Sequence, residues 1–154
     1  MSLDDVLAIG IAVPLGSHRF DADAIKAFAR KWDPQPFHLD EETARRSVFG
    51  GLCASGWHTA AVWMRLNVET GSGRRASAGS GPPPEFGPSP GFSNLKWPKP
   101  VYAGETVAYS RTALAHRALS SRPGWRLLSV RAEGIDSAGG KVLEFESVVL
   151  LKAS

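Results

Sequence analysis

The sequence predicts an α+β fold in which one antiparallel sheet curls around a single long helix. Residues 92–152 contain four β-rich segments separated by turn signals, which is typical of antiparallel strands. Residues 52–70 form a long segment without proline that would be apolar around much of its circumference as a helix. Such a helix must be covered on most sides, and a curled sheet provides that cover.

A strand and two helices are expected before the long helix. Residues 7–14 are rich in Ile and Val and predict a strand. Residues 21–32 place apolar side chains at helical spacing, with Asp21 as a candidate N-cap. This helix should end at Asp33, because the following proline cannot continue the ladder of hydrogen bonds. A short second helix is expected over residues 40–47.

The long helical segment follows a glycine turn at residues 49–51. Five of its apolar residues are expected to be buried: Leu52, Ala60, Trp63, Met64 and Val68. Residues 71–91 are Gly, Ser and Pro almost throughout, so they predict a loop that is too polar for the core. The strands expected after this loop are residues 92–97, 106–117, 125–136 and 141–152.

Length and composition indicate one globular domain over residues 1–154. A hydrophobic content of 43% and a charged content of 21% exclude the disordered and collagen-like classes. No apolar run approaches the ~20 residues that a membrane helix requires. The N-terminal residues are acidic where a secretory signal would be basic, and the single Cys53 cannot form an internal disulfide. We therefore expect a cytoplasmic protein that does not engage a membrane.

The basic side chains are concentrated after residue 50, although the whole chain carries a net charge of only +3. Such asymmetry fits either an anionic partner, such as a phosphorylated cofactor, or an ordinary solvated surface. The basic residues are scattered, and no aromatic-rich RNA-binding signature accompanies them, so nucleic acid is not expected as a partner.

Asp33 and His38 are the strongest candidates for chemistry. Pro34 and Pro36 lie between them and stiffen the segment, so the two side chains can converge at little entropic cost. A carboxylate beside an imidazole makes a useful acid–base pair near neutral pH. The alternative is that Asp33 only ends a helix and His38 lies on the surface. From the residues alone, this alternative stays open.

The turn at Gly50 and Gly51 is the second candidate element. If a helix starts there, its unpaired backbone N–H groups could stabilise a developing oxyanion, and the glycines would allow a ligand to approach closely. Ser55 would then lie one turn inside the helix. Its hydroxyl could bind a ligand or a catalytic side chain, or it could bond back to a helix carbonyl. A simple turn is the alternative for the glycine pair.

The remaining Cys and His residues give weaker signals. Cys53 lies in an apolar segment and is expected to be a buried structural residue. His58 could belong to the core or to an interface. His18 and His116 have no partner at metal-ligand spacing, so metal binding is not expected. The sequence also lacks the G-x-S-x-G, P-loop and G-x-G-x-x-G motifs of several large enzyme classes.

The chain resembles the MaoC-like dehydratases, which include the (R)-specific enoyl-CoA hydratases, in two motifs: DPQPFHLD at residues 33–40 and FGGLCASG at residues 49–56. The stretches 91–97 and 100–106 also look like a strand and a P-V-x-x-G-D-T turn of that family. The resemblance covers about residues 10–150. It implies the hot-dog fold, a long helix wrapped by a curled antiparallel sheet, and a dimer or higher homo-oligomer.

The resemblance further implies a hydro-lyase that adds water to an enoyl thioester or removes it from a 3-hydroxyacyl thioester. Asp33 and His38 would hold one water, with His38 taking its proton and Asp33 assisting or protonating the α-carbon. Backbone N–H groups near Gly50 and Gly51 would stabilise the thioester oxygen. Ser55 matches a supporting serine of the family.

The resemblance also bears on ligands. Phe49, in the second motif, is expected to contact the substrate. No cofactor is expected beyond the coenzyme A of the substrate, whose place an acyl carrier protein could take. The basic residues of the second half would suit its phosphates.

Two residues depart from the family signature, which usually has Gly before the catalytic Asp and Asn two residues after it. This chain has Trp32 and Gln35 at those positions, which leaves the acyl chain undefined. Two other functions remain open. A hot-dog thioesterase could use Asp33 to activate water on the thioester carbonyl, and a non-catalytic hot-dog protein could simply bind acyl thioesters.

Overall fold

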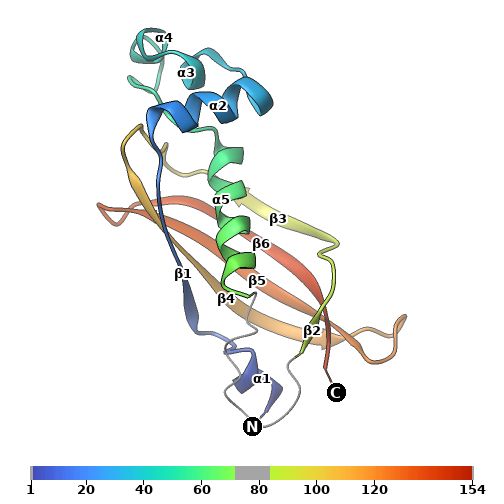
Figure 1. Ribbon diagram of the computed structural model, residues 1–154. Coiled ribbons are helices and arrows are strands. Elements are labelled where there is room, and N and C mark those ends of the chain that lie inside the picture. The colour runs from blue at the N-terminus through green and yellow to red at the C-terminus, as the bar shows by residue number, and fades with distance from the viewer. Residues whose placement is uncertain (1, 72–83, 154) are drawn as a thin grey trace.

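The computed structural model describes residues 2–71 and 84–153 and shows a curled antiparallel sheet packed against one long helix (Figure 1). The long strands lie in the order β1, β4, β5, β6. They span Ala12–Arg19 (β1), Thr106–Ala118 (β4), Trp125–Asp136 (β5) and Lys141–Lys152 (β6). The short strands β2 (Glu85–Phe86) and β3 (Gly91–Lys96) both pair with β6. This arrangement confirms the expected α+β class.

The long helix is α5 (Gly56–Glu69), and it is anchored to the inner face of the sheet by its buried side. Trp63 is 2% exposed, donates from Nε1 to the Ser110 carbonyl at 2.9 Å, and meets Phe145 edge-on. The Tyr109 hydroxyl donates to the Thr59 carbonyl at 2.9 Å. Because a misplaced helix would leave these buried polar groups unsatisfied, the bonds define the position of α5 over the sheet.

The prediction for the long helix was wrong at its start and on one face. Residues 52–55 are extended rather than helical, and Cys53 makes an isolated bridge to Tyr102. Leu52 is buried as expected, but outside the helix. Met64 and Val68 are 47% and 63% exposed, where burial was expected. The sheet covers one side of α5, so the opposite side of the helix stays open.

The N-terminal strand was also displaced from its expected place. The described chain begins with a short helix, α1 (Leu3–Val6). Ser2 and Asp5 form a reciprocal capping box at its N-terminus. The chain then turns through Ala8 and Gly10, which both have positive φ, before β1 begins. The expected strand at residues 7–14 therefore overlaps only the beginning of β1.

Three helices lie together beyond one end of α5, at the top of Figure 1. Helix α2 (Ala22–Trp32) has Asp21 as its N-cap and ends at Asp33, as predicted. Helix α4 (Glu41–Arg45) confirms the expected second helix, with somewhat shorter bounds. Between them, α3 (Pro36–Leu39) is a single turn that begins at Pro36, a favourable first position for proline.

The strand predictions after the loop were confirmed to within a residue or two. The bounds of β5 and β6 match the expected ranges, and β3 and β4 shift slightly at their ends. Part of the expected loop at residues 71–91 forms β2, which pairs Glu85 with Lys152. Residues 72–83 of that loop lie outside the described residues. None of the described helices has the length and apolar character needed to cross a membrane.

Candidate active site

His38 is brought inward by α3 and is 5% exposed. Its Nδ1 lies 2.6 Å from the Cys53 carbonyl oxygen. A carbonyl can only accept a hydrogen bond, so Nδ1 carries the proton of the neutral ring. The lone pair of the neutral imidazole is therefore on Nε2, the nitrogen that faces Asp33.

Asp33 occupies the C-cap of α2 and is held by two donors from other positions. The Ser55 hydroxyl donates to Oδ2 at 2.6 Å, and the Gln35 amide donates to Oδ1 at 2.7 Å. These bonds orient the carboxylate. The structure therefore ties the end of α2 to the start of α5 through the Ser55 side chain.

The two candidate side chains converge. Asp33 Oδ2 lies 3.5 Å from His38 Nε2. With a neutral imidazole and an ionised carboxylate, both of these atoms are hydrogen-bond acceptors. A single water that donates one hydrogen to each would satisfy both and would present its oxygen lone pairs outward. The pair therefore suits the holding of a reactive water.

Both side chains line a cavity of about 370 Å³ at the N-terminal end of α5. Most of the other lining residues are apolar or aromatic, among them Phe37, Phe49, Trp57, Trp97, Pro100 and Val101. Phe49 lines this cavity and meets the ring of Phe37, and its expected contact with substrate stays a prediction. A cavity of this size and lining is typical of small-molecule sites.

Gly50 and Gly51 do not line this cavity. The Gly50 N–H donates to the Ser47 carbonyl at 3.1 Å within a turn, and Gly51 faces Tyr102. The residue that occupies the expected position is Gly56, the first residue of α5. Within the described part of the chain, its N–H has no acceptor, and it points from the positive end of a 14-residue helix.

Trp97 closely approaches the backbone at Gly56 and so favours glycine at this position. A Cβ added there would overlap the indole ring of Trp97. Ser55 precedes it as the N-cap of α5 and also accepts from the Trp57 N–H at 3.2 Å. Ser55 was expected one turn inside the helix. In the structure it caps the helix, and its hydroxyl also holds the Asp33 carboxylate.

Lys99 is the cation among the described residues that line the cavity. Its Nζ lies 2.6 Å from Oδ2 of Asp136, and this hydrogen bond raises the pKa of Lys99 above its ordinary value. The ammonium group therefore stays charged at neutral pH. The Lys99 side chain is 44% exposed, which places a positive charge between the cavity and solvent.

The other Cys and His residues stand apart from this chemistry. Burial raises the pKa of the Cys53 thiol to about 11, so the thiol is protonated and unreactive. His58 packs between Phe20 and Phe28 outside the cavity. His116 bonds to Asp4, far from Asp33 in the fold. Among the described residues, no three His, Cys, Asp or Glu side chains gather as metal ligands would.

A model of the MaoC like domain matches residues 11–119, which is well over half of the chain. The chain belongs to the MaoC-like dehydratase family. This membership confirms the resemblance carried by the two motifs. It places the protein in a family of hydratases and dehydratases, the hydro-lyase class.

Solved structures of this family confirm the hot-dog fold. A MaoC-like dehydratase from Rhodospirillum rubrum is 37% identical, superposes with a TM-score of 0.79, and is matched over 100% of this chain and 98% of its own. The (R)-hydratase from A. caviae involved in PHA biosynthesis is 25% identical with a TM-score of 0.66, over 92% and 94% of the two chains.

One curated relative matches a shorter stretch. The uncharacterized protein YdeM of Bacillus subtilis is 39% identical over 71 residues, which is 46% of this chain and 50% of that protein. The aligned stretch therefore spans half the length of this relative.

The sequence analysis overlooked three residues of this cavity: Gly56, Trp97 and Lys99. Gly56 was hidden because the helix was expected to start earlier. Trp97 and Lys99 come from the end of β3 and the turn after it, a long way from Asp33 in sequence. A signal existed only for Gly56, since Ser-Gly before a helical segment is a plausible N-cap.

Proposed function

We propose that this MaoC-like protein is a hydratase or dehydratase of enoyl and 3-hydroxyacyl thioesters, with Asp33 and His38 as its acid–base pair. The observation that carries the proposal is the 3.5 Å separation of Asp33 Oδ2 and His38 Nε2 at a cavity that also holds the Gly56 N–H. Two acceptors and one free donor are the groups that water addition to a polarised double bond needs.

In the hydration direction, the water held by the pair attacks the β-carbon of the enoyl group. His38 Nε2 takes a proton from that water, because its lone pair faces Asp33 while Nδ1 is occupied by the Cys53 carbonyl. The pair returns one proton to the α-carbon, either from Asp33 or by way of it. The side chains thus carry the same number of protons before and after the reaction. Dehydration follows the reverse path.

The thioester oxygen gains negative charge when the β-carbon is attacked. We assign its stabilisation to the Gly56 N–H at the start of α5 rather than to Gly50 and Gly51, which lie outside the cavity. A helix N-terminus supplies both an unpaired donor and a favourable dipole. Removing one donor of this kind typically costs about 10²- to 10³-fold in kcat.

The cavity lining supports an acyl substrate. Phe37, Phe49 and Trp57 present hydrocarbon surface around the pair, which suits an acyl chain. Lys99 offers a positive charge toward solvent, which suits a phosphate of coenzyme A or of an acyl carrier protein. We therefore propose a thioester of one of these carriers as the substrate, with no further cofactor.

Crotonyl-CoA is the direct test. The wild-type protein should remove the enoyl absorbance without releasing free thiol. Asp33→Asn and His38→Gln should each lower the rate by about 10²-fold or more, since each removes one half of the acid–base pair. Asp23→Asn is the matched control, because it removes an exposed carboxylate from the same helix α2, and it should leave the rate unchanged.

Three results would contradict the proposal. Release of free thiol without hydration of the double bond would identify a thioesterase that uses Asp33 to activate water on the thioester carbonyl. Full activity in both Asp33→Asn and His38→Gln would remove the pair from the reaction, and no turnover of a panel of enoyl thioesters would favour a binding protein.

We also propose a homodimer, as the family resemblance implies. The edge strand β3 pairs with β6 on one side and carries Phe92, which is 59% exposed. An unpaired edge with a large apolar side chain favours association. Light scattering should give a dimer for the wild type and a smaller mass for Phe92→Glu, and a wild-type monomer would contradict the proposal.

A further inference from the structure

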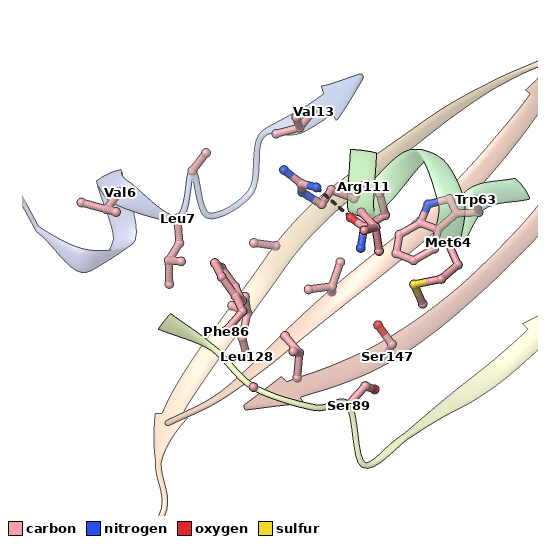
Figure 2. Close-up of a pocket in the computed structure, with 17 residues that line it drawn as sticks. Val6, Leu7, Val13, Trp63, Met64, Phe86, Ser89, Arg111, Leu128 and Ser147 are labelled. Atoms are coloured by element: carbon pink, nitrogen blue, oxygen red, sulfur yellow. Dashed lines mark hydrogen bonds between the residues drawn. The ribbon is translucent and has the colours of Figure 1, made fainter. Parts of the chain in front are cut away.

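A second cavity of about 330 Å³ lies at the other end of α5 (Figure 2). It is enclosed by α1, by the segment around β2 and by the inner face of the sheet. Among the described residues, none lines both this cavity and the one that holds Asp33 and His38. The two cavities therefore have separate linings.

Hydrocarbon groups make up most of the walls. Figure 2 shows Leu7, Phe86 and Leu128 on one side and Trp63 and Met64 on the other. The remaining apolar lining comes from Val6, Ala8, Val13, Val68, Ala113, Val130 and Val149. An apolar body of a few carbon atoms fits such walls by burying its surface against them.

Arg111 is the exception in this apolar lining. It follows Val107 and Tyr109 at two-residue spacing on β4, and both of these are buried in the core. Alternate residues of a strand share one face of a sheet, so Arg111 occupies an inward-facing position. Its cross-strand neighbours are Val13 and Ala132. A guanidinium is therefore built into the apolar side of the sheet.

The charge of Arg111 is not balanced by a carboxylate from the part of the chain that the structure describes. Within the described residues, none lies within ion-pair distance of Arg111, and the acceptor of its Nη1 is the neutral Asn67 side-chain oxygen at 2.7 Å. Arg111 is partly buried, and this burial lowers the pKa of its guanidinium from its ordinary value. A half-buried cation whose partner is an amide keeps guanidinium donors available for an anion.

A second polar group lies across the cavity from Arg111. Ser147 pairs with Val130 across β5 and β6, which places it on the inward face as well. Figure 2 shows its hydroxyl near that of Ser89, on the far wall from the guanidinium. The cavity thus has a strong anion-binding group at one wall, weak polar groups at another, and hydrocarbon between them.

We propose that this cavity binds a small organic acid with an unbranched apolar body, its carboxylate on Arg111. The planar guanidinium matches a carboxylate and supplies charge-assisted hydrogen bonds, which are stronger in a partly dehydrated site. The apolar body lies between the wall formed by Leu7, Phe86 and Leu128 and the facing wall of Trp63 and Met64. A phosphate would require further cations, and Arg111 is the one cation among the described lining residues.

Sodium hexanoate and its neutral analogue hexanamide are suitable probes for calorimetry or ligand-detected NMR. Hexanoate should bind the wild type more tightly than hexanamide. Arg111→Met should weaken hexanoate binding by about 10-fold or more and leave hexanamide binding nearly unchanged, because only the acid uses the guanidinium. Arg117→Met is the matched control, an exposed arginine on the same strand, and should have no effect.

Further variants test in which of the two cavities hexanoate binds. Asp33→Asn should keep full hexanoate binding, since Asp33 lies at the other cavity. Ala113→Phe should block both ligands by filling the wall beneath Arg111. If Arg111→Met does not fold, as judged by its thermal transition, Arg111→Lys replaces it and should weaken hexanoate by losing the planar geometry. Equal binding of acid and amide, or loss of hexanoate binding in Asp33→Asn but not in Arg111→Met, would overturn the proposal.

Discussion

The hydroxyl of Ser55 donates a 2.6 Å hydrogen bond to Oδ2 of Asp33, across 22 residues of sequence. The Ser55 Oγ also accepts a hydrogen bond from the Trp57 N–H and so caps α5. One side chain therefore couples the start of the helix that carries the Gly56 N–H to the carboxylate that faces His38. Ser55 therefore fixes the position of the Gly56 N–H, the proposed donor, relative to the proposed acid–base pair of Asp33 and His38.

Ser55→Ala should lower both activity and stability. Loss of the N-cap costs about 1 kcal/mol of folding free energy, and loss of the bond to Asp33 leaves that carboxylate free to rotate away from His38. We expect kcat for crotonyl-CoA hydration to fall by about 10-fold or more, with a smaller change in KM. Stopped-flow rates and thermal unfolding measure the two effects separately.

A double variant distinguishes positioning from simple destabilisation. In the Asp33→Asn background, Ser55→Ala should lower the thermal midpoint but should cause little further loss of kcat, because the carboxylate that it positions is gone. Ser55→Thr keeps a hydroxyl and should restore much of the rate. Additive losses of kcat in the double variant would show that Ser55 does not act through Asp33.

Gly56→Ala tests the start of α5. The new Cβ would overlap the Trp97 ring, so either the indole or the first turn of the helix must move. We expect a loss of kcat together with a lower thermal midpoint, since overpacking of this kind typically costs about 1–3 kcal/mol. The paired variant Gly56→Ala with Trp97→Ala removes the overlap and should recover stability. An unchanged kcat together with an unchanged thermal midpoint in Gly56→Ala would show that the packing of Trp97 on Gly56 does not fix the start of α5.

Lys99→Met tests recognition of the thioester carrier. If Lys99 meets a phosphate, its loss should raise KM for crotonyl-CoA several-fold, leave kcat nearly unchanged, and reduce the dependence of KM on salt. A short thioester without phosphates should be unaffected. Lys96→Met, at an exposed lysine of β3, is the control, and an equal rise of KM in that variant would show only a general effect of surface charge.

The sequence predicted the strands well because their signals are local. In β5 and β6, apolar and polar residues alternate between clear turn signals, and such a pattern does not depend on the rest of the chain. The start of α5 was missed because residues 52–54 are as compatible with a helix as the residues after them. The bridge from Cys53 to Tyr102, a contact between distant segments, draws them out as extended chain.

The candidate site also has a part that the sequence could predict and a part that it could not. Asp33 and His38 could be nominated from their spacing and from the family motifs. Their convergence depends on the Cys53 carbonyl and the Ser55 hydroxyl, which no local periodicity reveals. Arg111 gives no sequence signal either, since an arginine in an alternating strand normally faces solvent. Only the strand register shows that it faces inward.

His58 should make the protein sensitive to acid. It is 8% exposed between Phe20 and Phe28, its Nδ1 has no partner among the described residues, and burial lowers its pKa from 6.5 to about 4. Above pH 6.5 the folded and unfolded chains both hold a neutral ring. Between 6.5 and 4 the unfolded chain binds a proton that the folded chain does not, so stability falls as the pH is lowered. Between pH 7 and pH 5 this amounts to about 2 kcal/mol.

Urea unfolding of the wild type and of His58→Phe at both pH values measures this contribution. Phenylalanine keeps a ring between Phe20 and Phe28 but cannot take up a proton, so the variant should lose less stability between pH 7 and pH 5 than the wild type. His18 and Asp21 also interact electrostatically with His58, and they are present in both proteins, so the difference isolates the titration of His58. His58 lies on α5 two residues after Gly56, and α5 packs against α2, which ends at Asp33. Acid unfolding of this region should therefore abolish hydratase activity at the same pH midpoint at which α5 unfolds. Parallel pH profiles of the wild type and of His58→Phe would show that the buried ring does not set the acid limit of the fold.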